Sequence, residues 1–419
     1  MLRGGAERAA SIVRKHKPDM LLVLFVGILV LLGLIIIYAI SPPLAARAGG
    51  DIDPNHFMYR QLLYLLIGIG AFVGAFLIPV NFWRSIQGKL IVGALILGVM
   101  PYLLQSTSIG LCANGACRWL NLGIISFQPA EIMKFALVVF LASFLAARMK
   151  QGKLNDFQAT LVPVGIILFV VSVIVVGLQQ DLGTGITIFA IFITMLFMSG
   201  ANRRILAMVA AGVLALGTMF IIIAPHRIER ILTFVQHSSS TEDEMGYHIN
   251  QALIAVGSGG LTGKGLGQSV QAFGYLPEAA NDSIFAILAE IFGFLGTVAV
   301  LGIFAALLMR LLKIMDHSPN PYHRLLMAGI FGWVFSHAVV NIGAMLGIFP
   351  LTGITLPFVS FGGTSLLFML AALGVALQIS RYTSHLPQTN VTKGAYEDRR
   401  RGRGIGGARN PSAGSFSRT

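Results

Sequence analysis

Long runs of apolar residues, separated by shorter polar segments, make up most of this 419-residue chain. A helix of about 20 residues crosses the hydrocarbon core of a bilayer, and the apolar runs have the length of such helices. They cover residues 20–40, 59–79, 88–105, 129–148, 158–178, 183–199, 205–224, 283–312, 324–348 and 362–381. The pattern predicts an all-α polytopic membrane protein of about ten transmembrane helices, with a large extracytoplasmic loop, residues 225–281, between spans seven and eight.

The distribution of charge supports this prediction and gives it an orientation. The chain is 55% hydrophobic and only 11% charged, and 23 of its 30 Lys and Arg residues fall on one side of the predicted spans. The positive-inside rule makes that side the cytoplasm. We therefore expect a cytoplasmic basic tail at residues 1–19, a membrane domain at 20–381, and a disordered cytoplasmic basic tail at 382–419. The net charge of +13 is explained by this orientation, and we expect no nucleic-acid partner.

The stretch from Phe273 to Glu290 places acidic and amide side chains directly before an apolar helix. An acid at the mouth of a membrane helix is costly to keep ionised, so it usually faces protein or a water-filled cavity. Two hypotheses follow for this stretch. Asn281 or Asp282 caps the first turn of the helix, or Asp282 takes part in chemistry.

Lys134 lies just inside the predicted fourth span and therefore needs a partner. Glu131 is three residues earlier, on the same helical face, so the two side chains are candidates for a simple ion pair. Asp181 and Asp282, on the same predicted side of the membrane, are the other candidate partners.

Several features of the outer loops suggest a ligand site. Arg118, Arg227, Arg230 and Lys264 are basic residues in the two longest outer loops; they are either solvated or grouped around a pyrophosphate. Six glycines between Gly257 and Gly267 allow the backbone to approach a ligand closely. Residues 225–235 have the pattern of a helix lying along the membrane interface.

Two other outer segments carry structural predictions. Residues 341–367 contain prolines and glycines at membrane depth, where irregular backbone must be buried in protein or line a cavity; we expect a groove. Cys112 and Cys117, the two cysteines of the chain, flank a short turn on the side expected to be oxidising, and we expect a disulfide rather than two thiols.

Five blocks of sequence, in order, resemble the SEDS family of bacterial cell-wall polymerases, which includes FtsW and RodA. They are RWLNLG with QPAEIMK (118–134), QQDLGTG (179–185), QALIAVGSGGLTGKGLG (251–267), YLPEAANDSIFA (275–286) and GIFPLTGITLPFVSFGGTSLL (347–367). The resemblance covers roughly residues 20–381, and the spacing within the fourth block is closer to the FtsW branch. The resemblance leaves open whether the chain acts in cell division or in elongation.

The resemblance implies a peptidoglycan glycosyltransferase that polymerises lipid II at the outer membrane face. It implies a class B penicillin-binding protein as partner, together with other divisome or elongasome proteins. The acid of the family's P-E-x-H-x-D motif corresponds to Asp282, the lysine after Q-P-x-E to Lys134, and the acid of Q-x-D-x-G to Asp181. The expected catalytic residues are Asp282, Lys134 and Glu278, and the expected substrate-binding residues are Arg118, Asp181, Lys264, Gln251, Glu131 and Ser360.

The chain also departs from the family pattern. Members commonly have His at the position of Ala280, Phe at that of Ser283, Gln at that of His248 and a second Glu at that of Ile291. The carboxylate of Asp282 is retained, so its proposed role survives these changes.

The chemistry follows from the residue types. The attacking sugar hydroxyl is a poor nucleophile, and a carboxylate within reach can take its proton; Asp282 suits this role. Lys134 could keep Asp282 ionised, and Arg118 and Lys264 could stabilise the leaving pyrophosphate. No cofactor is certain, although a divalent cation, Mg²⁺ or Mn²⁺, held by Asp282 would suit this reaction. The alternatives are a flippase for lipid-linked precursor and a non-catalytic scaffold for the transpeptidase.

Overall fold

The computed structural model describes residues 16–49, 52–113, 115–123, 125–223 and 244–382. The two predicted cytoplasmic tails and the predicted interfacial helix at residues 225–235 lie outside these ranges, apart from a few residues next to the first and last helices. The predictions for them therefore stay predictions.

Ten helices in the described part of the chain are long and apolar enough to cross a membrane, which confirms the predicted fold class. They are α2 (Met20–Ala48), α3 (His56–Leu77), α4 (Val80–Leu103), α5 (Pro129–Lys150), the run Phe157–Leu178 that contains α6 (Val162–Ser172) between two π-helical turns, α7 (Leu182–Ser199), α8 (Arg203–Ile223), α11 (Ile284–Asp316), α12 (Pro321–Met345) and α13 (Thr364–Ile379). A shorter helix, α10 (Glu244–Ser258), lies in the connection between the seventh and eighth spans, where the large loop is predicted.

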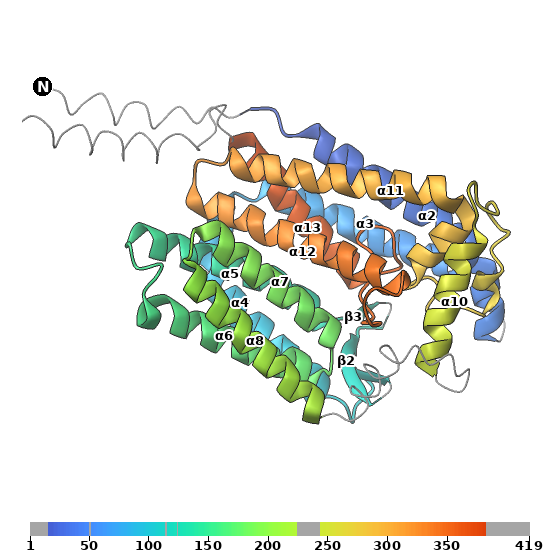
Figure 1. Ribbon diagram of the computed structural model, residues 1–419, viewed down its shortest axis with the longest axis horizontal. Coiled ribbons are helices and arrows are strands. Elements are labelled where there is room, and N and C mark those ends of the chain that lie inside the picture. Colours follow the sequence, from blue (N-terminus) through green and yellow to red (C-terminus); the bar gives the residue numbers. More distant parts are fainter. Residues whose placement is uncertain (1–15, 50–51, 114, 124, 224–243, 383–419) are drawn as a thin grey trace, which may run out of the picture.

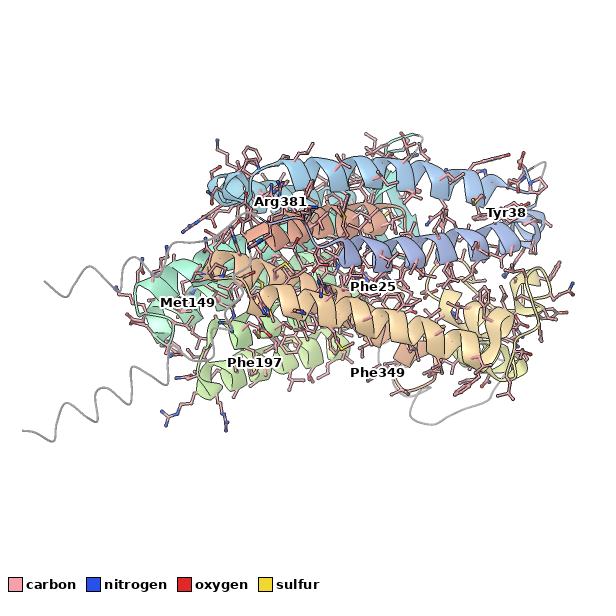
Figure 2. The ribbon with its side chains drawn as sticks, turned by 90° about the horizontal axis from the view of Figure 1, so that it is seen from above. Phe25, Tyr38, Met149, Phe197, Phe349 and Arg381 are labelled. Carbon is pink, nitrogen blue, oxygen red and sulfur yellow. A yellow bond between two sulfur atoms is a disulfide. The ribbon has the colours of Figure 1, made fainter. Side chains whose placement is uncertain are left out.

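The long helices lie side by side along the longest axis of the molecule, and α10, β2 and β3 gather at one end, which we call the loop end (Figure 1). At the opposite end, the terminal end, the backbone N–H of His16 donates to the carbonyl of Arg381. Asp19, just before α2, forms a salt bridge with Arg310 near the end of α11, at 2.6 Å. Figure 2 shows Tyr38 of α2 near the loop end and Met149 of α5 near the terminal end. The first and last described segments therefore meet at the same end of the bundle, as an even number of spans requires.

Burial divides the helices into a centre and a periphery. Most residues of α5, α12 and α13 are buried, whereas peripheral helices expose large apolar side chains such as Leu66, Leu77 and Leu214. Exposed apolar surface of this extent is expected of helices that face lipid. The central helices are therefore the ones that can hold polar side chains away from lipid.

The loop before α5 forms a three-stranded antiparallel sheet of β1 (Gly110–Ala113), β2 (Ala116–Asn121) and β3 (Ser126–Phe127), in that order. This sheet was not predicted, although the Asn-Gly pair at positions 114 and 115 is a strong hairpin signal. Cys112 and Cys117 pair across β1 and β2 and form a disulfide, which confirms the predicted bridge.

The irregular segment between α12 and α13, where we predicted a groove, is covered by protein over most of its length. Its later apolar side chains are packed inside the protein, among them Leu356, Phe358 and Val359, whereas Ile348 and Phe349 at its start are exposed. A Cβ placed on Gly33 of α2 would lie 2.5 Å from the carbonyl oxygen of Val359, so the two backbones are in direct contact. Of the two conditions that permit irregular backbone at membrane depth, burial in protein is the one met.

Candidate active site

Asp282 lies one residue before the end of a short turn, Pro277–Ser283, that leads into α11 at the loop end of the bundle. Its side chain is only 8% exposed, and its carboxylate oxygen Oδ1 has no hydrogen-bond partner among the described residues. Nearby, Asn281 donates its side-chain amide to the carboxylate of Glu278. Asp282 is therefore a buried acid, and its oxygen Oδ1, itself shielded from solvent, has no partner in the described structure.

This geometry argues against one of the two hypotheses for the acidic stretch, the helix cap. Ser283 occupies the N-cap of α11, and no side-chain hydrogen bond caps that helix within the described structure. Asn281 is bound to Glu278, so it does not cap the helix either. The capping hypothesis does not account for Asp282.

The surroundings of Asp282 make it easier to protonate than an ordinary aspartate. Burial raises the pKa of Asp282 to about 7, the negative charge of Glu278 adds to the rise, and the backbone N–H groups of Asp282 and Ser283 partly offset it. A carboxyl with a pKa near the pH of its surroundings can both accept and return a proton efficiently.

Asn341 of α12 holds the backbone of the Asp282 turn in place. Its side-chain amide donates to the carbonyl of Asp282 at 2.6 Å and to the carbonyl of Ile354 at 2.7 Å. A further backbone hydrogen bond joins Phe361 N–H to the carbonyl of Ala280. The turn is thus attached both to α12 and to the irregular segment before α13.

Asp181 lies across the same segment but acts as a helix cap. Its carboxylate accepts hydrogen bonds from the backbone N–H and the hydroxyl of Thr184, at 2.9 and 2.8 Å, and from the side-chain amide of Gln128 at 3.1 Å. A Cβ on Gly183 would lie 2.5 Å from the carbonyl oxygen of Thr352, so α7 begins against the irregular segment. Asp181 is fully engaged in holding the start of α7.

Lys134 is paired with Glu131, not with Asp181 or Asp282. Its Nζ lies 2.8 Å from Oε1 of Glu131, 3.0 Å from Nε2 of His337 and 5.1 Å from the centre of the Trp333 ring. His337 Nδ1 lies 3.2 Å from the carbonyl of Thr355, which can only accept, so Nε2 is the nitrogen that accepts from Lys134. The ion pair predicted at positions i and i+3 is confirmed. Lys134 does not contact the Asp282 carboxylate as we expected; it contacts His337, which in turn lies against the carbonyl of Thr355 in the irregular segment.

Arg118 of β2 is anchored to the loop before α7. Its guanidinium donates to the carbonyls of Gln179 and Gln180, at 3.0 and 2.8 Å. Gln180 has a positive φ of 53°, which costs free energy in a residue other than glycine. Arg118 therefore fixes the loop next to Asp181, and its guanidinium has further N–H groups beyond the two used here.

Lys264, which we expected beside a pyrophosphate, is held in an ion pair, and its side chain is 30% exposed. Its Nζ lies 2.7 Å from Oε1 of Glu290, a fully buried residue of α11. Glu290 also accepts hydrogen bonds from the hydroxyl of Ser269 and from the backbone N–H groups of Val270 and Gln271. An ammonium satisfied by a buried carboxylate is poorly placed to bind a second anion.

The glycine-rich loop makes its close contacts with α11. A Cβ on Gly259 would lie 2.1 Å from the carbonyl oxygen of Ala289, and one on Gly263 would lie 2.1 Å from that of Ile291. Gly263 also has a positive φ of 83°, a conformation that glycine adopts at little cost. At these two glycines the close approach is to a neighbouring helix.

Two other expected site residues have different surroundings. Ser360 is buried, and its hydroxyl accepts from the backbone N–H of Leu356, so it closes a turn of the irregular segment. Gln251 of α10, with Tyr247, Asn250 and two apolar neighbours, lines a cavity of about 450 Å³ at the loop end. The described residues contain no group of three or more His, Cys, Asp or Glu side chains that could hold a metal ion.

Comparison with known proteins gives the family. A model of the FtsW/RodA/SpoVE family, described as cell cycle protein, matches residues 19–385. The chain belongs to this family. The match spans all ten helices, and it confirms the resemblance drawn from the five sequence blocks.

Relatives of the FtsW/RodA/SpoVE family match nearly the whole chain. Stage V sporulation protein E of Bacillus subtilis is 39% identical over 378 residues, covering 89% of this chain and 99% of that protein. The probable peptidoglycan glycosyltransferase FtsW of Nitrosomonas europaea is 35% identical over 364 residues, covering 86% of this chain and 92% of that protein.

Solved structures of family members have the same fold. A chain from the study "Structural coordination of polymerization and crosslinking by a peptidoglycan synthase complex" matches with a TM-score of 0.68 and 26% identity, covering 88% of this chain and 99% of that one. Thermus thermophilus rod shape determining protein RodA matches with a TM-score of 0.60 and 26% identity, covering 88% and 98%.

The roles of three polar residues of this FtsW/RodA/SpoVE family member were not predicted from the sequence. Asn341, His337 and Glu290 lie within apolar runs, and each holds a site element through the contacts above. Polar and ionisable residues inside membrane helices are costly and usually functional. That rule, applied to the eighth and ninth spans, would have found them.

Proposed function

We propose that this protein is a peptidoglycan glycosyltransferase that polymerises lipid II into glycan strands at the outer face of the bacterial plasma membrane, with Asp282 as general base. The observation that carries the proposal is the state of Asp282: buried, with a raised pKa and an oxygen that no described residue engages. The relatives named as peptidoglycan glycosyltransferases support the reaction class.

The reaction joins a sugar hydroxyl to an anomeric carbon that carries a pyrophosphate. The carboxylate of Asp282 accepts the proton of the attacking hydroxyl as the new C–O bond forms. The bond between the anomeric carbon and the pyrophosphate oxygen breaks, and the departing group carries the negative charge away. Glu278 contributes indirectly, since its charge helps to raise the pKa of Asp282.

The leaving pyrophosphate needs positive charge beside it. Arg118 is the candidate from the described residues, because only two of its donors are used by the loop carbonyls. A divalent cation, Mg²⁺ or Mn²⁺, would be held by one oxygen of the Asp282 carboxylate together with substrate phosphates, since Mg²⁺ commonly uses one or two carboxylates in this way. It would supply neutralising charge to the leaving group.

The proposed partner is a class B penicillin-binding protein, a transpeptidase that crosslinks new strands, within the divisome or elongasome. The solved relative that comes from a peptidoglycan synthase complex supports this partnership. Both the substrate and the partner would act at the loop end of the bundle, where Asp282 lies.

The test is polymerisation of lipid II by the purified protein, with and without a class B partner, read as glycan strands on a gel. Strands of increasing length are expected with the partner present. Transport of lipid II across vesicles without polymerisation would favour the flippase, and inactivity in both assays would favour the scaffold.

The pH dependence of the reaction is expected to report on Asp282. Because the acid must be deprotonated to act as a base, the rate should rise with pH through about pH 7, the pKa given by its surroundings. Glu278→Gln removes the negative charge that helps to raise the pKa of Asp282, so that pKa falls. The acid limb of the pH–rate profile, where the rate rises with pH, then moves to lower pH. Glutamine keeps an oxygen acceptor for Asn281. A limb that stays in place, or moves to higher pH, would contradict this assignment.

The orientation in the membrane is a separate prediction. The excess of basic residues on one side places both termini in the cytoplasm and the loop end outside. Reporter fusions at Ser239 and Arg418 should therefore report opposite sides of the membrane. The same sidedness at both positions would overturn the proposed topology and the outward location of Asp282.

A further inference from the structure

His248 of α10 makes a hydrogen bond to the residue next to Asp282. Its Nε2 lies 2.7 Å from the hydroxyl of Ser283, although 35 positions separate the two residues in the sequence. His248 is half-buried and Ser283 fully buried. Both are positions at which this chain departs from the pattern of the family, and the structure brings the two departures together.

The direction of this hydrogen bond follows from the other partner of the serine. The Ser283 hydroxyl lies 2.9 Å from the carbonyl of Pro277, which can only accept. A serine hydroxyl has a single hydrogen, so when Ser283 donates to Pro277 it must accept from His248. Burial lowers the pKa of His248 to about 4, so the imidazole is neutral near pH 7. Nε2 then carries its one proton and donates it to Ser283.

The contact acts on the turn that carries Asp282. The backbone N–H of Ser283 also bonds to the carbonyl of Glu278, at 3.2 Å. Glu278 has a positive φ of 49°, and such a conformation in a non-glycine residue persists only where its surroundings hold it. The turn is therefore fixed from two sides, by Asn341 of α12 at the carbonyl of Asp282 and by His248 of α10 at Ser283.

We propose that His248 is a positioning residue for Asp282, acting through Ser283. The contact joins α10, an element of the large loop between spans seven and eight, to the turn that presents the acid. The position of the Asp282 carboxylate then depends on α10 being packed against the turn. The proposal rests on the function proposed above, and it adds a contact that depends on His248 and Ser283.

The test is a double-mutant cycle on the polymerisation of lipid II by the full chain in complex with its class B partner. His248→Ala and Ser283→Ala should each lower kcat by about 10-fold to 10²-fold, the cost of misplacing a catalytic group by a fraction of an ångström to 1 Å. KM for lipid II should change less than about twofold, because neither residue is placed against substrate. The double variant should be no slower than the slower single variant, since both changes remove the same contact.

His248→Gln provides the rescue arm of this experiment. The glutamine side chain carries an N–H donor at nearly the reach of Nε2, so this variant should keep most of the wild-type kcat where His248→Ala loses it. A residue that only fills space would not show this difference. Should His248→Ala fail to fold, Ser283→Ala and His248→Gln still carry the comparison.

His323→Ala is the matched control. His323 is also a partly buried imidazole, but it lies 18 residues before Asn341 on α12, about 27 Å away along the helix axis. It should leave the rate unchanged.

Provided that the wild-type complex polymerises lipid II, any one of three results would overturn the positioning role. These are a wild-type kcat in His248→Ala, additive losses in the double variant, and a change in KM alone. A wild-type complex that forms no strands would remove the proposed function and the positioning role with it.

Discussion

Asp282→Asn is expected to abolish glycan polymerisation, lowering the rate by about 10²-fold to 10⁴-fold, the usual contribution of a general base. Asparagine has nearly the shape of aspartate but cannot take a proton at neutral pH. The cap of α11 does not use this side chain, so the helix loses nothing by the change. The measurement is strand formation from lipid II by the purified complex, with thermal unfolding and partner binding recorded on the same preparation.

A matched aspartate elsewhere separates loss of a base from loss of any carboxylate. Asp156 accepts from the backbone N–H of Ala159 at the N-cap of a π-helical turn, and asparagine can keep that bond. Asp156→Asn should therefore polymerise lipid II at the wild-type rate. If Asp282→Asn does the same, Asp282 is not the base and the proposed mechanism fails.

Lys134→Met is expected to have the largest effect on stability. It leaves the carboxylate of Glu131, only 3% exposed, as a buried charge without its partner. Breaking a buried pair in this way costs about 3–5 kcal/mol, which should appear as a lower unfolding temperature in detergent and a lower yield of folded protein. The double change Glu131→Gln with Lys134→Met should recover much of the loss, because neither charge is then buried alone.

Lys150→Met is the control for this pair, since Lys150 lies on the same helix but is exposed. It should unfold like the wild type. Because Lys134 contacts Glu131 and His337 and not the Asp282 carboxylate, the acid limb of the pH–rate profile should not move in Lys134→Met. An unfolding temperature equal to that of the wild type would show that the pair is not needed for the fold.

The helices could be predicted from the sequence because each depends on a local property. An apolar run of sufficient length can satisfy its backbone in lipid only as a helix, so ten runs become ten spans. The sheet before α5 was missed because its strands are short and its signal is a single Asn-Gly turn. The irregular segment before α13 was recognised, but whether protein or water covers it depends on helices far away in the sequence.

In the candidate site, too, local features could be predicted and contacts between distant helices could not. Asp282 was found because an acid beside an apolar helix is unusual whatever surrounds it. Glu131 could be named as a candidate partner of Lys134 from its spacing. The contacts of Lys134 with His337 of α12 and of Lys264 with Glu290 of α11 could not be deduced, because each depends on which helix packs opposite. Charge alone gives no order of preference among several acids on the same side of the membrane.

The two hydrogen bonds of Asn341 also bear on biosynthesis. This side chain, on the ninth span, joins the turn before the eighth span to the irregular segment that follows the ninth span. The ribosome must therefore complete α12 and the residues up to Ile354 before the turn at Asp282 can take its final form. A nascent chain arrested after α11 would be anchored in the membrane by eight helices and would still lack an assembled site, so the chemistry becomes available only when synthesis of the membrane domain is nearly finished.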